Sequence, residues 1–323
     1  MKTRILVTGA LGQIGSELIP ALRSVYGEDQ VVASDIRMPP RGTDGPFEFV
    51  DTTNLRQLTE VVRRNEIGTI YHLAALLSAV AESKPQVAWD VNMGGLYRVL
   101  EVARESRCAV FHPSSIGAFG PGTPKDRTPQ DTVQRPTTMY GVTKVAGELL
   151  CDYYFHRFNV DTRGVRFPGL ISYGAPPGGG TTDYAVEIFY EAIRHEHYTC
   201  FLEPDTRLDM MYMPDAIKAA IDVMEAGRDR LVHRNAFNVT AMNFTPEELA
   251  AAIRKHIPGF RIEYHVDPVR QAIADSWPNS LDDSAAREEW GWSPAFGLET
   301  MVEDMLENLG KKVRPTESRT RRI

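Results

Sequence analysis

The sequence predicts an α/β fold in which a doubly wound parallel sheet is joined by a smaller, interleaved C-terminal lobe. Two observations predict this fold. Short apolar runs alternate with stretches of helical spacing through the first half of the chain, and a glycine-rich turn follows the first apolar run. Repeats of strand, helix and strand form parallel sheets with right-handed crossovers. Ligands of such sheets bind at the carboxyl ends of the strands.

The first half of the chain supplies the elements of this sheet. β-branched and apolar runs predict strands at residues 4–8, 30–34, 69–73, 109–113 and 160–167. Apolar residues at helical spacing predict helices at residues 14–26, 54–65, 90–105 and 139–158. We therefore expect residues 1–173 to form a Rossmann-type nucleotide-binding domain.

The pattern changes after Gly174. A Pro- and Gly-rich loop at 175–180, whose triple glycine predicts a mobile lid, precedes a helix expected to begin near 181–183. Later strands are predicted at 209–213 and 236–240, and later helices near 245–256 and 284–290. We expect residues 206–241 to return to the main sheet, and residues 174–205 and 242–323 to form a substrate lobe.

The composition excludes several classes of partner. The 323 residues include 36 Lys and Arg against 43 Asp and Glu, and the net charge of −7 gives no general electrostatic reason to bind nucleic acid or an anionic membrane. Cys108, Cys151 and Cys200 are widely spaced and form neither a disulfide framework nor a zinc pattern. We therefore expect a soluble cytoplasmic protein that uses no metal.

The glycine-rich turn lies between the first predicted strand and the first predicted helix. Its spacing, G-x-x-G-x-x-G, permits a tight turn and a close approach of the backbone to a ligand. A helix N-terminus at this place favours a pyrophosphate group. The turn therefore predicts a dinucleotide site, whose expected contacts are Gly9, Leu11, Gly12, Gln13, Ile14 and Gly15.

An acidic residue, Asp35, follows the second predicted strand. An acid about 20 residues after the glycine turn binds the adenosine ribose hydroxyls. It also disfavours the additional phosphate of NADP, because two unit charges about 4 Å apart repel by roughly 4 kcal/mol at an effective dielectric constant of about 20. The positive charge of Arg37 reduces this repulsion. We expect both residues in the cofactor site and NAD as the cofactor.

A phenol and an ammonium group lie four residues apart, in Tyr140 and Lys144. On a helix the two side chains share one face. A free phenol is a poor base at neutral pH, but a nearby cation favours the tyrosinate form, which can accept a proton from an alcohol. Ser114 and Ser115 directly follow the strand predicted at 109–113, and their hydroxyls can reach a substrate at the same edge of the sheet. These residues together predict an oxidoreductase centre.

These features resemble the extended short-chain dehydrogenase/reductase family, and the resemblance covers nearly the whole chain. The matching segments are residues 9–15, 35, 72–75, 92–95, 114–120, 140–144 and 165–174. The resemblance implies that Ser115 is the catalytic hydroxyl and that Tyr140 is the base. It also implies that Lys144 tunes Tyr140 and holds the nicotinamide ribose. Ser114 stays an alternative to Ser115.

The resemblance assigns further cofactor contacts and an assembly. Asp51 is the expected adenine contact, and residues 73–75 are the expected wall beside the dinucleotide. The remaining expected cofactor residues are Thr52, Leu73, Ala74, Ala75, Asn92 and Phe167. The resemblance to the family also implies a homodimer through the helices predicted at 90–105 and 139–158.

Three differences from the motifs of other family members narrow the range of possible substrates. Ile116 and Gly117 stand where sugar-nucleotide dehydratases carry an acid pair. This chain therefore lacks the acid and the base that the elimination of water requires. Leu208 stands where many UDP-sugar epimerases carry a diphosphate-binding arginine, although Arg207 is adjacent. The insert at residues 178–187 suits a small charged ligand better than a long one.

Residues 174–184 resemble the L-threonine 3-dehydrogenase branch of the family. That branch oxidises the β-hydroxyl of L-threonine to 2-amino-3-oxobutyrate and transfers a hydride to NAD. Thr181 and Thr182, at a helix start, can offer hydroxyl and N–H groups to a carboxylate, and Asp183 either pairs with the substrate ammonium or caps the helix. The resemblance also brings Ser78 and Trp277 toward the amino acid.

Two other functions stay open at this point. A UDP-sugar 4-epimerase with tightly held NAD would bind UDP and show no net reduction of NAD. A non-enzymatic dinucleotide sensor could keep the glycine turn, but it has no need of the Tyr, Lys and Ser side chains that are all present here.

Overall fold

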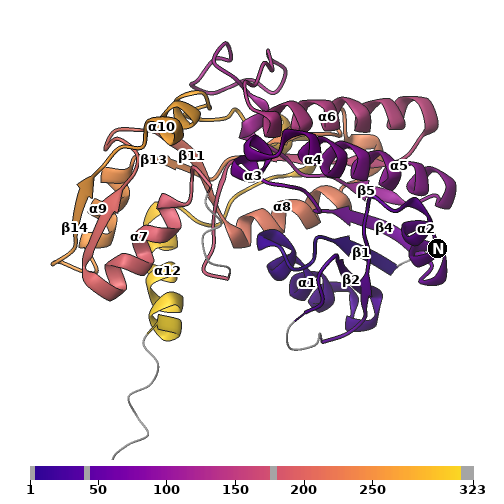
Figure 1. Cartoon of the computed structure of the whole chain (residues 1–323), viewed down its shortest axis with the longest axis horizontal. Coiled ribbons are helices and arrows are strands. Elements are labelled where there is room, and N and C mark those ends of the chain that lie inside the picture. Colours follow the sequence, from indigo (N-terminus) through magenta and orange to yellow (C-terminus); the bar gives the residue numbers. More distant parts are fainter. Residues whose placement is uncertain (1–3, 40–43, 175–179, 314–323) are drawn as a thin grey trace, which may run out of the picture.

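The computed structural model describes residues 4–39, 44–174 and 180–313, which form two lobes side by side (Figure 1). The larger lobe holds the main sheet and the smaller lobe holds most of the C-terminal third. The predicted lid falls mainly on residues 175–179, which lie outside the described residues.

The larger lobe is built on a six-stranded parallel sheet with the order β3-β2-β1-β4-β5-β7. Its strands are β1 (Arg4–Thr8), β2 (Val31–Asp35), β3 (Phe47–Phe49), β4 (Ile67–His72), β5 (Ala109–Phe111) and β7 (Thr162–Arg163). The strand order reverses between β1 and β4, which places the ligand-binding crevice at the carboxyl ends of these two strands. The predicted fold class is confirmed.

Three short strands of the larger lobe form a separate small sheet, in which one strand follows β5 along the chain and another follows β7. They are β6 (Ser114–Ser115), β8 (Val165–Phe167) and β12 (Phe237–Asn238), and β8 pairs in parallel with both of the others. The strand predicted at 160–167 is interrupted at Gly164. A Cβ at this glycine would collide with the carbonyl oxygen of His112, so only glycine allows the two chain segments to approach so closely.

The segment predicted as a strand at 209–213 pairs differently from the expectation. It forms β11 (Leu208–Tyr212), which lies between β9 (Gly169–Ile171) and β13 (Met242–Phe244) in a separate three-stranded sheet. Its successive side chains enter two different apolar clusters: Met210 packs in the smaller lobe and Met211 in the larger one. β11 therefore joins the lobes, and the exact division into domains stays a prediction.

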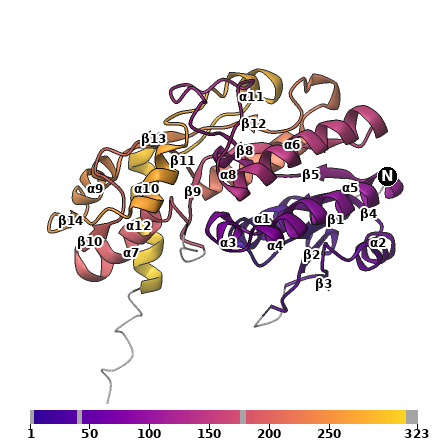
Figure 2. The ribbon, with the colours of Figure 1, turned by 45° about the horizontal axis from the view of Figure 1, so that its top comes forward.

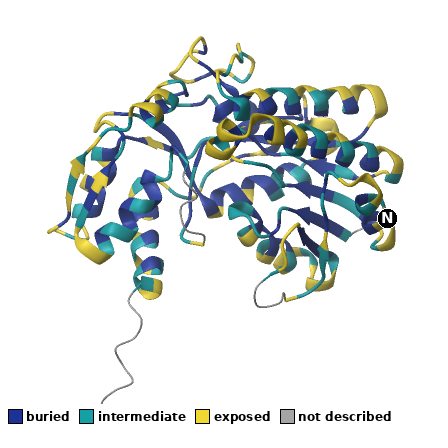
Figure 3. Cartoon of the chain, viewed as in Figure 1, coloured by how far each residue is buried: buried dark blue, intermediate teal, exposed yellow. Residues whose placement is uncertain are grey.

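Helices cover both faces of the main sheet (Figure 2). One face carries α2 (Leu55–Arg64), α5 (Gly95–Ser106) and α6 (Met139–Phe158), and the other carries α1 (Gln13–Tyr26), α8 (Met213–Glu225) and α11 (Ser284–Trp290). The side chains of β1 point alternately to the two faces of the sheet, which explains this arrangement. Leu6 packs in the apolar cluster on the first face, and Ile5 and Val7 pack in the apolar cluster on the second face. Buried residues accordingly fill the middle layer (Figure 3).

The smaller lobe packs helices against a two-stranded parallel sheet. Its elements are α7 (Tyr184–His195), α9 (Pro246–Arg254), α10 (Pro268–Asp275), α12 (Leu298–Val313), β10 (His197–Cys200) and β14 (Arg261–Tyr264). A capping box between Thr245 and Glu248 begins α9. Among the described helices, none has both the length and the apolar character needed to cross a bilayer.

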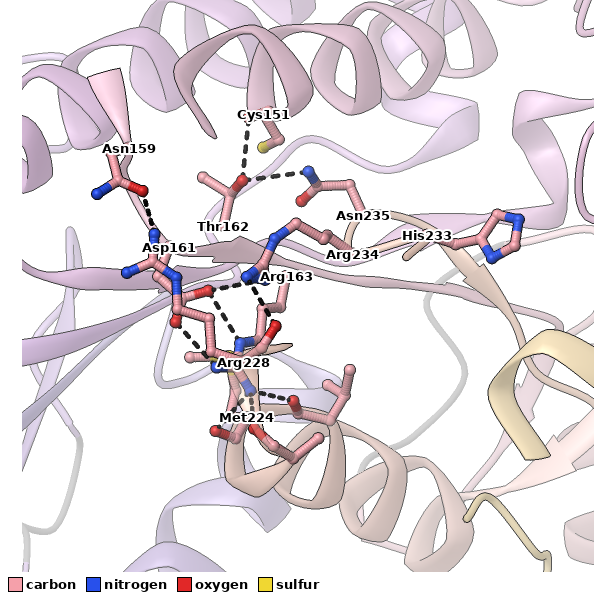
Figure 4. A network of polar contacts seen from close by, with 12 residues as sticks. Cys151, Asn159, Asp161, Thr162, Arg163, Met224, Arg228, His233, Arg234 and Asn235 are labelled. Atoms are coloured by element: carbon pink, nitrogen blue, oxygen red, sulfur yellow. Dashed lines mark hydrogen bonds and ion pairs between the residues drawn. The ribbon is translucent and has the colours of Figure 1, made fainter. Parts of the chain in front are cut away.

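A polar network at the amino ends of the strands fixes the end of α8 to β7 (Figure 4). Arg163 Nη1 donates to the last carbonyl groups of the helix region, those of Val223, Met224 and Ala226, at 2.8, 3.0 and 2.7 Å. The same guanidinium binds Asp161 at 3.0 and 2.9 Å, and Arg234 contacts this carboxylate at 3.4 Å. Carbonyl groups that the helix leaves unpaired are thereby satisfied by a buried side chain.

A buried carboxyl group at the junction of the lobes makes stability depend on pH. Asp209, on β11, accepts hydrogen bonds from Leu281 N at 3.0 Å and from Thr240 Oγ1 at 2.5 Å. Burial raises the pKa of Asp209 to about 8, although these hydrogen bonds act in the opposite direction. The folded protein therefore holds this proton to a higher pH than the unfolded chain does.

We predict that Asp209→Asn removes part of this pH dependence. The unfolded carboxyl releases its proton near about pH 4, so the free energy of unfolding of the wild type falls as the pH rises toward about 8. Asparagine imitates the protonated carboxyl and does not titrate. The difference in free energy of unfolding, variant minus wild type, should therefore grow between about pH 5 and about pH 8 in urea titrations. A difference independent of pH would contradict this assignment.

Candidate active site

The glycine turn connects β1 to α1 at the carboxyl edge of the sheet. Gly9 has a φ of +72°, and a Cβ there would lie 2.8 Å from Ala74 N, while a Cβ on Gly15 would lie 2.5 Å from the carbonyl oxygen of Gly9. Gly12 caps α1 without a side-chain hydrogen bond, and the first turn of the helix has no acidic residue. The N–H groups and the positive dipole of this helix end are therefore available to an anion.

Asp35 is buried at the end of β2 and holds the glycine turn. Its Oδ2 accepts a hydrogen bond from Leu11 N at 3.0 Å, and its Oδ1 accepts from Arg37 N and Nε at 3.1 and 3.2 Å. A carboxylate has about four lone-pair sites, so capacity remains for ribose hydroxyls. The helix end and the adjacent carboxylate together fit a dinucleotide.

Asn92 links the expected cofactor wall to α6, which carries Tyr140 and Lys144. It lies in a π-helical turn (Asp90–Gly94) between α4 (Pro85–Trp89) and α5. Its side chain accepts from Leu76 N at 2.8 Å and donates to Leu76 O and to Thr143 Oγ1, both at 3.1 Å. Turns of this kind are frequent at functional sites. A direct contact of Asn92 with a cofactor stays a prediction.

The other expected cofactor residues end or follow strands of the larger lobe. Asp51 and Thr52 follow β3, where Asp51 Oδ1 accepts hydrogen bonds from Thr53 N and Oγ1 at 2.8 and 2.7 Å. Residues 73–75 follow β4, and Phe167 is the last residue of β8. Their contacts with a cofactor also stay predictions.

Tyr140 lies in the first turn of α6. Thr138 Oγ1 caps the helix by accepting from Gly141 N at 3.1 Å, and Glu82, on α3 (Ser78–Ser83), accepts from Met139 N at 2.6 Å. The positive end of the helix dipole stabilises negative charge in this turn. Lys144, one turn later, has its Nζ 5.3 Å from the centre of the Tyr140 ring.

The positive charge near Tyr140 comes from Lys144 and not from the two histidines of this region, His72 and His112. Lys144 is buried, and its Nζ donates to the carbonyl oxygen of Pro113 at 2.7 Å. His72 and His112 stack with ring centres 5.7 Å apart. Burial, assisted by the charge of Lys144, lowers the pKa of His72 to about 3 and holds that of His112 well below its ordinary value. Both imidazoles are therefore neutral at physiological pH.

The two serines of the expected site have different partners. The hydroxyl of Ser114 is buried and donates to Glu148, whereas Ser115 Oγ accepts from Gly117 N at 3.1 Å. A Cβ on Gly117 would lie 3.2 Å from the Tyr140 ring and 3.5 Å from Ser115 Oγ. Ser115 and Tyr140 thus border the same small space beside Gly117.

The expected substrate residues come from separate elements. Thr181, Thr182 and Asp183 precede α7, and Asp183 Oδ2 accepts from Gly180 N at 2.7 Å. Ser78 begins α3, and Trp277 follows α10. One apolar cluster contains Trp277, the first residue of α7, and Ile116, the neighbour of Ser115. The smaller lobe therefore packs beside Ser115, but contacts of these residues with a substrate stay predictions.

Sequence reasoning missed three charged residues that support this site. Glu148 lies eight residues after Tyr140 on α6, a helical spacing that could have revealed it. Arg166 and Glu82 carry no comparable signal, because their partners are distant in the sequence. Over the described ranges, no group of three or more His, Cys, Asp or Glu side chains could hold a metal ion.

Comparison with protein families identifies the class of the protein. The model of the NAD dependent epimerase/dehydratase family matches residues 5–240, which include the glycine turn and the Tyr140–Lys144 pair. The chain belongs to this family. Membership of this family, which is of the extended short-chain dehydrogenase/reductase type, implies a nicotinamide dinucleotide cofactor and oxidoreductase chemistry.

Similar members of the family include solved structures. An L-threonine dehydrogenase from Clostridium difficile is 58% identical, with a TM-score of 0.95 over 97% of this chain and 99% of that one. The holo form of an L-threonine dehydrogenase from Cupriavidus necator is 53% identical, with a TM-score of 0.93 over 95% of this chain and 99% of that one. An uncharacterized epimerase/dehydratase from Staphylococcus haemolyticus is 57% identical over 96% of this chain and 98% of its own.

Proposed function

We propose that this protein is an NAD-dependent L-threonine 3-dehydrogenase, which oxidises the β-hydroxyl of L-threonine to 2-amino-3-oxobutyrate. The observation that carries the proposal is the grouping of Ser115, Tyr140 and Lys144 at the sheet edge that also holds the dinucleotide turn. It occurs in a chain 58% identical to an L-threonine dehydrogenase over 97% of its length.

In the proposed reaction, Tyr140 withdraws the proton of the β-hydroxyl while Ser115 hydrogen-bonds the same oxygen. Lys144 and the N-terminus of α6 stabilise the charge on the Tyr140 oxygen before the proton arrives. A bound nicotinamide supplies the acceptor for the hydride that leaves the β-carbon. Asp35 binds the adenosine ribose, and its charge disfavours the additional phosphate of NADP.

Residues of both lobes form the proposed amino-acid site. The hydroxyl and N–H groups of Thr181 and Thr182 receive the carboxylate, and Asp183 receives the ammonium, with Ser78 and Trp277 closing the site. The alternative function, a UDP-sugar 4-epimerase, needs an arginine that binds the diphosphate of the substrate. Arg207 is instead bound to Glu248 at 2.5 Å and to Asn243 at 3.1 Å, which favours a small substrate.

We predict that Tyr140→Phe lowers turnover by at least ~100-fold, because the ring is kept and the proton acceptor is lost. The measurement is the initial rate of NADH formation from L-threonine and NAD, followed by near-UV absorbance. Tyr153→Phe, a tyrosine change on the same helix and away from the expected site residues, is the matched control and should turn over normally. Near-normal turnover of Tyr140→Phe would remove this residue from the role of base.

The same assay with other ligands separates the competing functions. Parallel reactions contain NADP in place of NAD, or L-serine, L-allo-threonine or UDP-galactose in place of L-threonine. A protein that reduces no NAD with any amino acid, but converts UDP-galactose, is the UDP-sugar 4-epimerase of the alternative. A protein that binds NAD and converts none of these substrates supports a dinucleotide sensor.

We also propose that the protein forms a homodimer through α5 and α6. Large apolar side chains are exposed on these helices and on the adjoining α4, namely Trp89, Tyr97, Leu149 and Tyr153. Contiguous exposed apolar patches mark association surfaces.

We predict that Leu149→Arg, at a side chain 63% exposed, yields monomers in sedimentation velocity. Val232→Arg, 79% exposed and outside these helices, should remain dimeric, and a dimeric Leu149→Arg protein would contradict this interface.

A further inference from the structure

A buried carboxylate lies next to the expected catalytic residues without being one of them. Glu148 follows Tyr140 by eight residues and Lys144 by four on α6, so the three side chains share one face of the helix. Its side chain is 6% exposed, and that of its ion-pair partner Arg166 is 7% exposed. A buried ion pair is costly unless its geometry and its further hydrogen bonds are good.

The carboxylate of Glu148 is fully occupied by donors from three other segments. Arg166, on β8, donates from Nε to Oε1 at 3.1 Å and from Nη2 to Oε2 at 2.9 Å. Gln134, in the segment before α6, donates to Oε2 at 2.8 Å. The hydroxyl of Ser114, on β6, donates to Oε1. The carboxylate therefore joins α6 to the strand end that carries Ser115.

Arg166 extends this connection to the rest of the sheet edge. Its Nη1 donates to Gln130 O at 2.8 Å and to Asn238 Oδ1 at 3.0 Å, on β12. The guanidinium also lies 5.2 Å from the centre of the Phe119 ring. The Glu148–Arg166 pair is therefore held from several directions and can impose its geometry on Ser114.

The position of Ser114 determines that of Ser115. Both belong to the short strand β6, in which successive side chains point to opposite sides. When the Ser114 hydroxyl is held by Glu148, the Ser115 hydroxyl is turned toward Gly117 and the Tyr140 ring. A displacement of about 1 Å in such a group can cost about 100-fold in rate.

We propose that Glu148 and Arg166 are positioning residues that set the Ser115 hydroxyl against Tyr140, acting through the hydroxyl of Ser114. Neither charged side chain has to touch the substrate for this role. The kinetic part of the test rests on the proposed dehydrogenase function, whereas the structural part does not.

The kinetic test compares Ser114→Ala, Glu148→Gln and the double variant. Each single variant should lower kcat by between about 10-fold and 100-fold while the KM for NAD stays within about twofold, because the turn that binds the cofactor is untouched. The double variant should be no slower than the slower single variant, because both changes break one connection. Losses in kcat that multiply in the double variant would overturn the proposal.

The matched control is Asp161→Asn. This change also removes a carboxylate from buried arginines, Arg163 and Arg234, but at the amino ends of the strands (Figure 4). It should lower the Tm and leave kcat unchanged, whereas a general effect of losing a buried ion pair would lower kcat in both cases. If Glu148→Gln fails to fold, Ser114→Ala, which loses a single oxygen atom, decides the question by the same readouts.

The structural test is a crystal structure of ligand-free Glu148→Gln, or of Ser114→Ala, beside the wild type. We expect the Ser115 hydroxyl to leave its 3.1 Å contact with Gly117 N in the variant. An unmoved Ser115 would overturn the proposal, even if activity fell. If the wild type fails to oxidise L-threonine, the proposed function fails, but this crystallographic comparison still decides the positioning role.

Discussion

The hydrogen bond from Lys144 Nζ to the carbonyl oxygen of Pro113 holds α6 against the segment that carries the two serines. An ammonium group buried to this extent needs a strong acceptor, and the carbonyl group of the buried Pro113, between β5 and β6, provides one. The contact fixes where α6 begins relative to Ser115, and so where the Tyr140 oxygen lies. Glu148 supports the same junction one turn further along the helix through Ser114.

The cofactor edge and the smaller lobe are connected through α1. Glu17, in the helix whose N-terminus forms the dinucleotide turn, accepts a hydrogen bond from the Ser172 hydroxyl. At the next residue of the same segment, Lys312 of α12 donates to the carbonyl oxygen of Tyr173 at 2.7 Å. The chain that leads from β9 toward Thr181 is thus attached to both lobes.

Much of the fold could be predicted from the sequence, because the relevant signals are local. The bounds of α6 and α11 agree with the prediction, and the glycine turn lies where the pattern places it. The break at Gly164 could not be predicted, since the close neighbour of this glycine is the carbonyl oxygen of His112, a residue distant in the sequence that follows β5. The prediction for 209–213 was wrong in its pairing for a similar reason, because β11 packs against both lobes.

The candidate site shows the same limit. The sequence favoured Ser115 and kept Ser114 as an alternative. The structure gives the two hydroxyls different partners, because Ser114 donates to the buried carboxylate of Glu148, which comes from a different element. Asn92 illustrates a second case: its family position indicated the cofactor, whereas its described hydrogen bonds hold the Leu76 segment and α6. Such roles depend on tertiary neighbours, which no spacing pattern contains.

The most direct test of the central claim follows the hydrogen atom on the β-carbon. The protein is incubated with NAD and L-threonine that carries deuterium at this carbon, and the reduced nicotinamide is analysed by mass spectrometry. Our account predicts that each NADH gains one deuterium and that 2-amino-3-oxobutyrate or its decarboxylation product appears in equal amount. NADH without deuterium, or no NADH beside conversion of a UDP-sugar, would contradict the account.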